Sequence, residues 1–328
     1  MTFKVFVTAP RLAPSGLQWL ERHGCTIAFL RDANSTAEVE REMTATPFDA
    51  VISRTVDLTA AAIACCPTLK VISKHGVGVS NIAVDAATQR GIPVYVTPGA
   101  NAQSVAELTF GLMLAAARRI HRLDAELRAG RWTRAQDGMQ LGGRRLGLVG
   151  FGQVGQRVAR IAQAVGMEVH AYDPMLAASS PVPGVELHRT LQALLAHSDV
   201  LSLHVPLTGQ TRGLIDATAF DLLPPGALLV NTARGEVVDE AELIARLRDG
   251  RLAGAGLDTM SVEPLPAGHA LTELPNVVLT PHVGGSTPAA LDAMAEGAAR
   301  NVLGFLQGRP PDARSCVNPQ VLRTTALT

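Results

Sequence analysis

A glycine-rich turn between a short apolar run and a longer amphipathic run constrains this chain more than any other feature. The run Leu146–Val149 leads directly into the sequence GFGQVG, which starts at Gly150, and a helical period follows. Gly150 permits the tight turn, Gly152 lets the backbone approach a pyrophosphate, and Gly155 lets helix and strand pack closely. The helix N-terminus would face this anion. The pattern therefore predicts a dinucleotide-binding βαβ unit, whose turn residues would be Gly150, Gly152, Gln153, Val154 and Gly155.

An aspartate follows the next predicted strand, Glu168–Tyr172. Asp173 lies about eighteen residues after Gly155, where a carboxylate can accept hydrogen bonds from the adenosine ribose hydroxyls. A 2′-phosphate would be repelled there, and the three residues that follow supply no arginine to bind it. Asp173 therefore favours NAD over NADP.

Length and strand rhythm together predict two domains. A chain of 328 residues exceeds the size of one ordinary core, and short β-branched runs alternate with helical stretches in both halves. We expect an α/β protein with two doubly wound, Rossmann-like or flavodoxin-like, parallel-sheet domains and an interdomain cleft. Residues 1–101, completed by 286–328, would bind substrate, and residues 102–285 would bind NAD through a six-stranded sheet. The stretch Ala102–Ile120 is expected to be one long bridging helix, and Ala289–Leu306 to cross back to the first domain.

Charge and hydropathy exclude several classes of protein. The 29 basic residues balance the 29 acidic ones, so no overall basic field exists to hold nucleic acid. The longest apolar runs are shorter than a bilayer span, and no secretion signal is apparent at the N-terminus, so we expect no membrane association. The four cysteines form no CxxC pair, which indicates neither a disulfide framework nor a metal site and favours the cytoplasm.

Three predicted strands end in ionisable residues, where ligands bind in open parallel sheets. His282 can hold a proton near neutral pH and pass it to a carbonyl oxygen. Glu263 can hydrogen-bond the far ring nitrogen of that histidine and favour its charged form. Arg234 offers a planar fork for a substrate carboxylate. From spacing alone, one histidine among nine is more often structural, and Arg234 and Glu263 could equally be surface charges at strand exits.

Several motifs, read together, resemble the NAD-dependent D-2-hydroxyacid dehydrogenase family, in particular its phosphoglycerate dehydrogenase-like branch. The resemblance covers nearly the whole chain and rests on GVGVSNI from Gly76, TPGAN from Thr97, SVAE from Ser104, the glycine turn, HVPLT from His204 and the three strand ends. It implies that Arg234, Glu263 and His282 are catalytic. It also implies that Val205 and Pro206 line the adenine pocket, although a strand end that packs the core explains them too.

The same resemblance implies further binding roles. Thr232 and Ala233 would pass beside the nicotinamide, Asp258 would bind its carboxamide, and Gly284 would belong to the cofactor site. Backbone N–H groups of Val77 and Gly78 would hold the substrate carboxylate together with Arg234 and His282, with an ordinary tight turn as the alternative.

The first loop departs from the family pattern, because Ser80 and Ala83 stand where acidic residues are usual. Arg54 matches a basic position of the phosphoglycerate branch, and Lys74 replaces its usual arginine. We expect Arg54, Lys74 and His75 to form a cationic wall for a phosphate, sulfonate or second carboxylate. Solvated charges at strand ends are the alternative.

The expected activity is NAD-dependent interconversion of a D-2-hydroxy acid and its 2-oxo acid. A 3-phosphoglycerate dehydrogenase of serine synthesis is an alternative, and a non-catalytic NAD(H)-sensing protein that resembles the corepressors of this family is a more distant one. The family's members are commonly dimers, so a homodimer is expected, with contacts through Ala102–Ile120 and the segment around Trp132.

Overall fold

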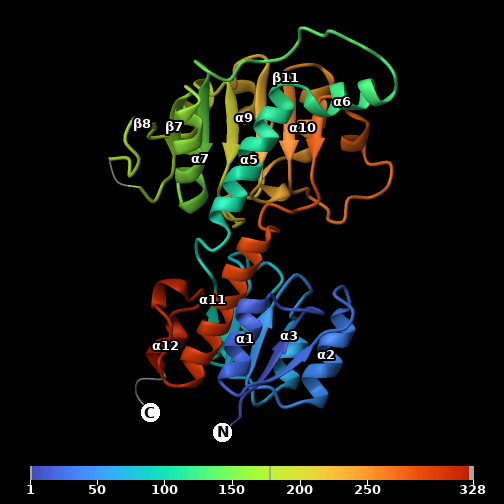
Figure 1. Cartoon of the computed structure of the whole chain (residues 1–328). Coiled ribbons are helices and arrows are strands. Elements are labelled where there is room, and N and C mark those ends of the chain that lie inside the picture. Colours follow the sequence, from blue (N-terminus) through green and yellow to red (C-terminus); the bar gives the residue numbers. More distant parts are fainter. Residues whose placement is uncertain (1, 177–178, 325–328) are drawn as a thin grey trace. The chain divides into compact units, whose positions relative to one another are not determined.

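The computed structural model describes residues 2–176 and 179–324. The chain divides into two compact units, which we call unit 1 (Met1–Asn101 and Ser286–Thr328) and unit 2 (Ala102–Gly285). Each unit is a parallel β-sheet with helices on both faces (Figure 1). The expected fold class of two doubly wound α/β domains is confirmed.

Unit 1 contains a five-stranded parallel sheet in the order β2-β1-β3-β4-β5. Its strands are β1 (Lys4–Val7), β2 (Thr26–Phe29), β3 (Ala50–Ser53), β4 (Val71–Lys74) and β5 (Val94–Tyr95). Strand β2 lies on one side of β1, whereas β3 and the later strands are added on its other side, so the strand order reverses between β1 and β3. Ligands bind at such a switch point, outside the carboxyl ends of the strands, and Arg54 directly follows β3.

Alternation along the strands divides the core of unit 1 into two layers. Val5 and Val7 face a cluster that includes α1 (Pro14–Arg22) and α11 (Pro288–Leu306), which lie side by side in Figure 1. Phe6 faces the opposite cluster, which is built with α2 (Thr36–Ala45), α3 (Ala60–Cys65) and α4 (Val84–Gln89). In the inner strands β3 and β4 every side chain is therefore buried, as a two-faced parallel sheet requires. The unit ends with η3 (Ala313–Ser315) and α12 (Gln320–Thr324).

Unit 2 contains a seven-stranded parallel sheet in the order β12-β11-β10-β9-β6-β7-β8. Its strands are β6 (Arg145–Val149), β7 (Glu168–Tyr172), β8 (Val185–Leu187), β9 (Val200–Leu203), β10 (Ala227–Asn231), β11 (Leu252–Leu257) and β12 (Val277–Leu279). The expectation of six strands is wrong, because the sheet has a seventh strand, β8. Three residues are too few for an alternation of apolar and polar side chains to indicate a strand in the sequence. The switch point lies between β6 and β9, next to the glycine turn.

Helices cover both faces of this sheet. The face that carries Leu146 and Leu148 packs against α5 (Ala102–Ala117) and α7 (Gln153–Ala164), and α5 runs along it in Figure 1. The other face packs against α8 (Leu191–Ala196), α9 (Ala217–Leu222) and α10 (Glu240–Arg248). Two short 3₁₀ turns, η1 (Gly235–Val237) and η2 (Ala270–Glu273), follow β10 and β11.

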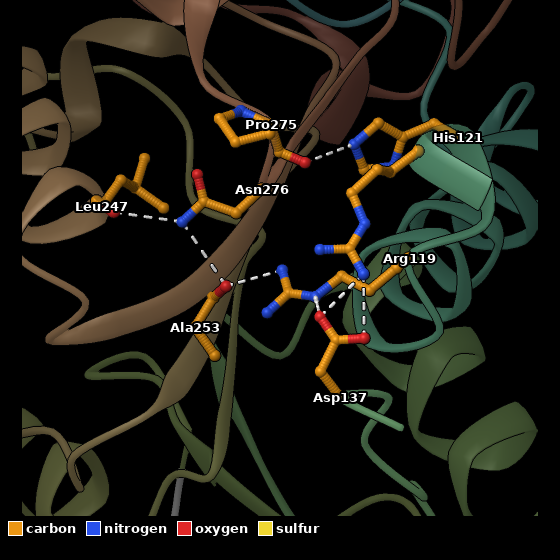
Figure 2. Close-up of polar contacts among 8 residues, drawn as sticks. Arg119, His121, Asp137, Leu247, Ala253, Pro275 and Asn276 are labelled. Atoms are coloured by element: carbon orange, nitrogen blue, oxygen red, sulfur yellow. Dashed lines mark hydrogen bonds and ion pairs between the residues drawn. The ribbon is translucent and has the colours of Figure 1, made fainter. Parts of the chain in front are cut away.

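The helix expected over Ala102–Ile120 is broken near its end. Helix α5 stops at Ala117, Arg119 has a φ of 55°, and α6 (Ile120–Arg128) starts in a new direction. Figure 2 shows the contacts that hold this corner: Arg119 donates to the carbonyl oxygen of Ala253 at 2.7 Å and lies beside Asp137. A contact between His121 Nε2 and the carbonyl oxygen of Pro275, at 3.0 Å, adds to them. These partners are distant in sequence, so helical periodicity alone did not predict the break.

Among the residues that the structure describes, none of the helices combines the length and the apolar character that a membrane span needs.

Candidate active site

Glycine is needed for a different structural reason at each of the three glycine positions of the turn in unit 2. Gly150 has a φ of 88°, and a Cβ there would lie 2.6 Å from the carbonyl oxygen of His204. A Cβ on Gly155 would lie 2.5 Å from the carbonyl oxygen of Gly150. A Cβ on Gly152 would meet no atom within 4 Å. Gly150 and Gly155 therefore permit packing, whereas Gly152 keeps a space beside the helix N-terminus open.

This open space suits the pyrophosphate of a dinucleotide. Gly152 is the N-cap of α7, and no side chain caps the first turn. Backbone N–H groups of that turn can then bind an anion, which the helix dipole also favours. Asp173, at the end of β7, accepts hydrogen bonds from the backbone N–H groups of Phe151 and Met175, both at 2.9 Å. Its carboxylate is thereby fixed beside the turn, where ribose hydroxyls could also reach it.

Other expected cofactor residues lie at neighbouring strand ends. Val205 is half-buried against the core and sits beside Gly150, whereas Pro206 is exposed. The hydroxyl oxygen of Thr232 lies 2.7 Å from that of Thr109 on α5. Ala233 is buried, and its N–H donates to Asn231 Oδ1 at 3.0 Å. These residues line the edge of the sheet that carries the glycine turn.

Asp258 is engaged more heavily by the protein than the sequence suggests. It is 1% exposed and accepts hydrogen bonds from the hydroxyl of Thr280 (2.6 Å) and the backbone N–H groups of Val283 and Gly284 (both 2.8 Å). Three of its lone-pair positions are therefore occupied within the chain. Its visible role is to hold the turn that carries His282.

His282 and Glu263 form a hydrogen-bonded pair. The distance from His282 Nδ1 to Glu263 Oε2 is 2.7 Å, and the other carboxylate oxygen accepts the N–H of Met260 at 3.0 Å. Partial burial would raise the pKa of Glu263, but the hydrogen bond and charge of His282, the Met260 N–H and the charge of Arg234 outweigh it and lower that pKa. The ionised carboxylate is an acceptor only, so Nδ1 carries a hydrogen and Nε2 is left for another partner.

The backbone presents His282 in an uncommon conformation. Its φ of 53° lies in the left-handed region, which costs energy for a residue with a Cβ. The N–H of His282 lies 2.8 Å from the carbonyl oxygen of Asp258 and 3.0 Å from that of Thr280. The end of β11 thus imposes the turn that aims the imidazole.

Arg234 lies close enough to Glu263 for its positive charge to contribute to the lowered pKa of that carboxylate. Gly235 explains how these strand ends meet: a Cβ there would overlap the backbone of Met260, so only glycine permits the close approach. Asn231 donates to the carbonyl oxygen of Arg234 at 2.8 Å and fixes the turn. The structure therefore brings Arg234, Glu263 and His282 together within unit 2.

Glu240 supports this arrangement and was missed in the sequence. Its carboxylate accepts the N–H of Ser261 at 3.0 Å and the hydroxyl of Ser261 at 2.7 Å, and it lies 3.3 Å from His269. Glu240 begins α10, so the loop that carries Glu263 is anchored to a helix. An acidic residue in the first turn of a helix is ordinarily explained by the helix dipole. The sequence pattern therefore did not indicate that Glu240 also binds Ser261.

The cationic residues of unit 1 are grouped at the β1–β3 switch point. Arg54 is partly buried, its N–H donates to Thr8 Oγ1 at 2.9 Å, and its Nη1 lies 3.2 Å from His75 Nε2. Burial, followed by the positive charge of Arg11, lowers the pKa of the Arg54 guanidinium. Arg11, which sequence reasoning did not single out, is thus a second cation at this edge.

The expectation that His75 adds a positive charge to this wall is wrong. Burial, reinforced by the charges of Arg54 and Lys74, lowers the pKa of His75 to about 4, so the ring is neutral near pH 7. Lys74 is 8% exposed, and its ammonium donates to the carbonyl oxygen of Arg54 and, at 2.5 Å, to Asn81 Oδ1. Lys74 therefore stabilises the loop that follows β3.

Val77 and Gly78 lie in a loop that follows β4. Gly76 has a φ of 123°, accepts the N–H of Thr97 at its carbonyl oxygen and donates its own N–H to Thr97 Oγ1. Val77 is 48% exposed. Within the described part of the chain, the N–H groups of Val77 and Gly78 donate to no protein acceptor, which leaves them able to bind a ligand.

Known proteins resemble this chain over nearly its whole length. Residues 110–284 match the family of the D-isomer specific 2-hydroxyacid dehydrogenase, NAD binding domain. Glyoxylate reductase of Thermococcus litoralis is 41% identical over 79% of this chain and 80% of its own length. D-3-phosphoglycerate dehydrogenase of Archaeoglobus fulgidus is 37% identical over 96% of this chain but only 59% of its own length.

A solved structure extends the likeness to the fold. The TT0316 protein of Thermus thermophilus has a TM-score of 0.85 and 37% identity, over 96% of this chain and 100% of that one. The expected family, NAD as cofactor and the reaction class are thereby confirmed. The chain belongs to the D-isomer specific 2-hydroxyacid dehydrogenases and is an NAD-dependent oxidoreductase that acts on the CH–OH group of a 2-hydroxy acid.

Proposed function

We propose that Arg234, Glu263 and His282 are the catalytic residues of this dehydrogenase. The 2.7 Å contact between His282 Nδ1 and the Glu263 carboxylate carries the proposal, because it leaves Nε2 as the ring atom that exchanges a proton with the substrate oxygen. Glu263 fixes the tautomer and stabilises the charged ring. Arg234 binds the substrate carboxylate as a planar fork.

The glycine turn and Asp173 would hold NAD, which supplies or accepts the hydride when it is bound. In the direction of reduction, the charged His282 donates its Nε2 proton to the oxygen that develops negative charge at C2. In the direction of oxidation, neutral His282 takes the proton from the hydroxyl at Nε2. We propose that the N–H groups of Val77 and Gly78 in unit 1 bind a carboxylate.

Arg54 favours a substrate with a second anionic group. Its guanidinium lies at the switch point of unit 1, and the positive charge of Arg11 is close enough to lower its pKa. The two cations repel each other, and a bound anion would reduce this repulsion. Phosphohydroxypyruvate and other 2-oxo acids with a phosphate, sulfonate or second carboxylate have this chemistry. A phosphoglycerate dehydrogenase activity therefore fits as well as the reduction of glyoxylate or hydroxypyruvate.

A substrate panel tests these assignments. NADH oxidation is measured with glyoxylate, hydroxypyruvate, phosphohydroxypyruvate, sulfopyruvate and oxaloacetate for the wild type, His282→Gln and Arg54→Gln. We expect His282→Gln to lose activity on every substrate while it still binds NADH. Arg54→Gln should raise KM about tenfold or more for an anionic-tailed substrate and leave KM for glyoxylate unchanged. Equal effects of Arg54→Gln on both kinds of substrate would disprove the distal anion site.

We further propose that unit 2 mediates a homodimer. Large apolar side chains are exposed on α5, α6 and the segment that follows them: Leu114, Ile120, Leu127 and, at 75% exposure, Trp132. A nearby depression of about 480 Å³ is lined by Leu247, Leu274 and Pro275 and by three arginines. Light scattering after size exclusion should give a dimer mass for the wild type and a monomer mass for Trp132→Glu; a monomeric wild type at micromolar concentration would contradict the proposal.

A cytoplasmic location is also proposed. The four cysteines, which all lie in the described ranges, are free, and unpaired thiols suit a reducing compartment.

A further inference from the structure

Three histidines and a glutamate, which we call the histidine cluster, lie together on unit 2 at the edge of its sheet. His170 is in β7, Glu186 is in β8, His188 directly follows β8, and His197 ends α8. The register of the sheet pairs His170 with Glu186, and His188, two residues later, is on the same face as Glu186. The neighbours Val169 and Ala171 face the opposite layer. The cluster therefore occupies the face that α8 covers.

The ligand atoms of His170, Glu186 and His188 have a spacing close to that of ligands around one ion. His170 Nδ1 and His188 Nε2 are 3.0 Å apart, and the Glu186 carboxylate oxygens lie 3.7 Å from the first and 4.0 Å from the second. One ligand atom from each of the three residues fits within 4.8 Å of the others. Two imidazole nitrogens bound to one tetrahedral zinc ion are separated by about 3.3 Å. A movement of a few tenths of an ångström would thus convert the pair into a chelate.

The protonation states suit metal binding. Burial is the largest cause that lowers the pKa of His170, and it is likewise the largest cause for His188, whose pKa the charge of His170 lowers further. Both rings are therefore neutral near pH 7. Neutral imidazole is the form that ligates metals. One of the two rings donates the hydrogen of the 3.0 Å contact, and a shift of that hydrogen to the other nitrogen of the same ring frees both facing lone pairs without loss of a proton.

His197 lies beside these three residues, outside the group whose ligand atoms are within 4.8 Å of one another, so its ring has to move closer to become a fourth ligand. Its ring centroid lies 5.3 Å from that of His188 and 6.1 Å from that of His170. Its Nδ1 lies 2.9 Å from the carbonyl oxygen of Ala193, and donation of a hydrogen to this acceptor leaves Nε2 as the ring's free lone pair. Metal-bound histidines commonly donate the hydrogen of their other ring nitrogen to a backbone carbonyl oxygen.

We propose that His170, Glu186 and His188 form a binding site for a late first-row divalent cation, with His197 as a fourth ligand once its ring moves toward the ion; zinc is the probe. Two or three imidazoles and one carboxylate are a donor set that zinc accepts in tetrahedral geometry. The site does not include the residues proposed for catalysis. A bound ion would join β7, β8 and α8 and so stabilise the outer edge of the sheet.

The test is a zinc titration of the full chain without an affinity tag, after dialysis against a chelator, with a chromophoric competitor as the readout. We expect one site in the wild type that His188→Gln and Glu186→Gln weaken at least about tenfold. His23→Gln is the matched control, because His23 is an exposed histidine of unit 1 and its loss should leave the affinity unchanged. Thermal unfolding in chelator verifies that each variant is folded, and in zinc only the wild type and His23→Gln should gain in Tm.

Crystals soaked in zinc locate the ion. Anomalous density between His170 and His188 is expected. Equal zinc affinity of the wild type, His188→Gln and Glu186→Gln would overturn the proposal, and so would anomalous density found only at His282 or at the cysteines.

Discussion

At the scale of single residues, the proposed acid/base pair depends on one hydrogen bond. The carboxylate of Glu263 fixes the hydrogen of His282 on Nδ1 and lies beside the charge of Arg234. One side chain thus orients the imidazole and balances the positive charge that the imidazole acquires. The dyad can work in both directions of the reaction, because only the starting protonation state of His282 differs.

The first prediction concerns this proton. Reduction needs charged His282 and oxidation needs the neutral ring, so with chemistry rate-limiting the rate of reduction should fall as pH rises, whereas the rate of oxidation should increase. Glu263→Gln removes the carboxylate that orients the ring of His282 and should lower kcat by about a hundredfold. Pre-steady-state rates between pH 5 and 9 check this. A kcat that Glu263→Gln leaves unchanged would show that the carboxylate does not act on His282.

The second prediction concerns Gly152. A Cβ there meets no protein atom, so Gly152→Ala should fold with an unchanged Tm, but its methyl group would occupy the space left for the pyrophosphate. We expect the Kd for NADH, measured by fluorescence titration, to rise about tenfold or more. Gly111→Ala is the control, since a Cβ at Gly111 also meets open space, on α5. If both variants bind NADH as the wild type does, the assignment of the turn fails.

At the scale of elements, the proposed active site depends on polar side chains that hold the loops at three strand ends. The turn after β10 is held by Asn231, the turn after β12 by Asp258, and the loop after β11 by Glu240 at the start of α10. Each anchor is a polar side chain that satisfies backbone N–H or C=O groups which would otherwise lack partners. These anchors fix the positions of the three loops that carry Arg234, Glu263 and His282.

The third prediction tests the anchor on α10. Glu240→Gln weakens the hydrogen bonds to Ser261 and loosens the loop that carries Glu263, so kcat should fall about fivefold to tenfold while KM for NADH stays constant. Glu242→Gln, on the same helix, removes only an ion pair with Arg246 and should leave kcat unchanged. The pH profile separates the two roles: a positioning residue alters the profile of His282, whereas a merely structural residue lowers stability alone. Identical kinetics of the two variants would refute the anchor.

At the scale of the whole molecule, buried polar groups make stability depend on pH. His75 is 7% exposed, and burial together with Arg54 and Lys74 lowers its pKa from the ordinary 6.5 to about 4. Between these values the unfolded chain binds a proton at this position and the folded chain does not. The free energy of unfolding therefore decreases as pH falls through this window.

The fourth prediction follows from this difference. His75→Asn should remove up to roughly 3 kcal/mol of the stability change between pH 6.5 and pH 4. Urea unfolding at several pH values, with fluorescence as the readout, measures it. The comparison uses the slope of stability against pH, so a constant penalty of the substitution does not matter. Parallel curves for the variant and the wild type would mean that His75 is not the group responsible.

The sequence by itself predicted much of the fold and a dinucleotide site, and its resemblance to a known family predicted the reaction class. The glycine turn, Asp173 and the polar strand ends are local patterns, in which each residue's role depends on a few neighbours along the chain. Alternation of strands and helices likewise predicted two parallel-sheet domains, because burial on both faces imposes apolar runs that are visible in the sequence.

Only the tertiary structure decided the remaining features, because they depend on burial and on contacts between distant segments. The neutrality of His75 follows from its surroundings, and the pairing of Arg11 with Arg54 follows from the order of strands in unit 1. Short strand β8 is recognisable only through its partner β7, and that pairing creates the histidine cluster. Residue types fixed which chemistry was available, whereas the fold decided which side chains meet and in which charge state.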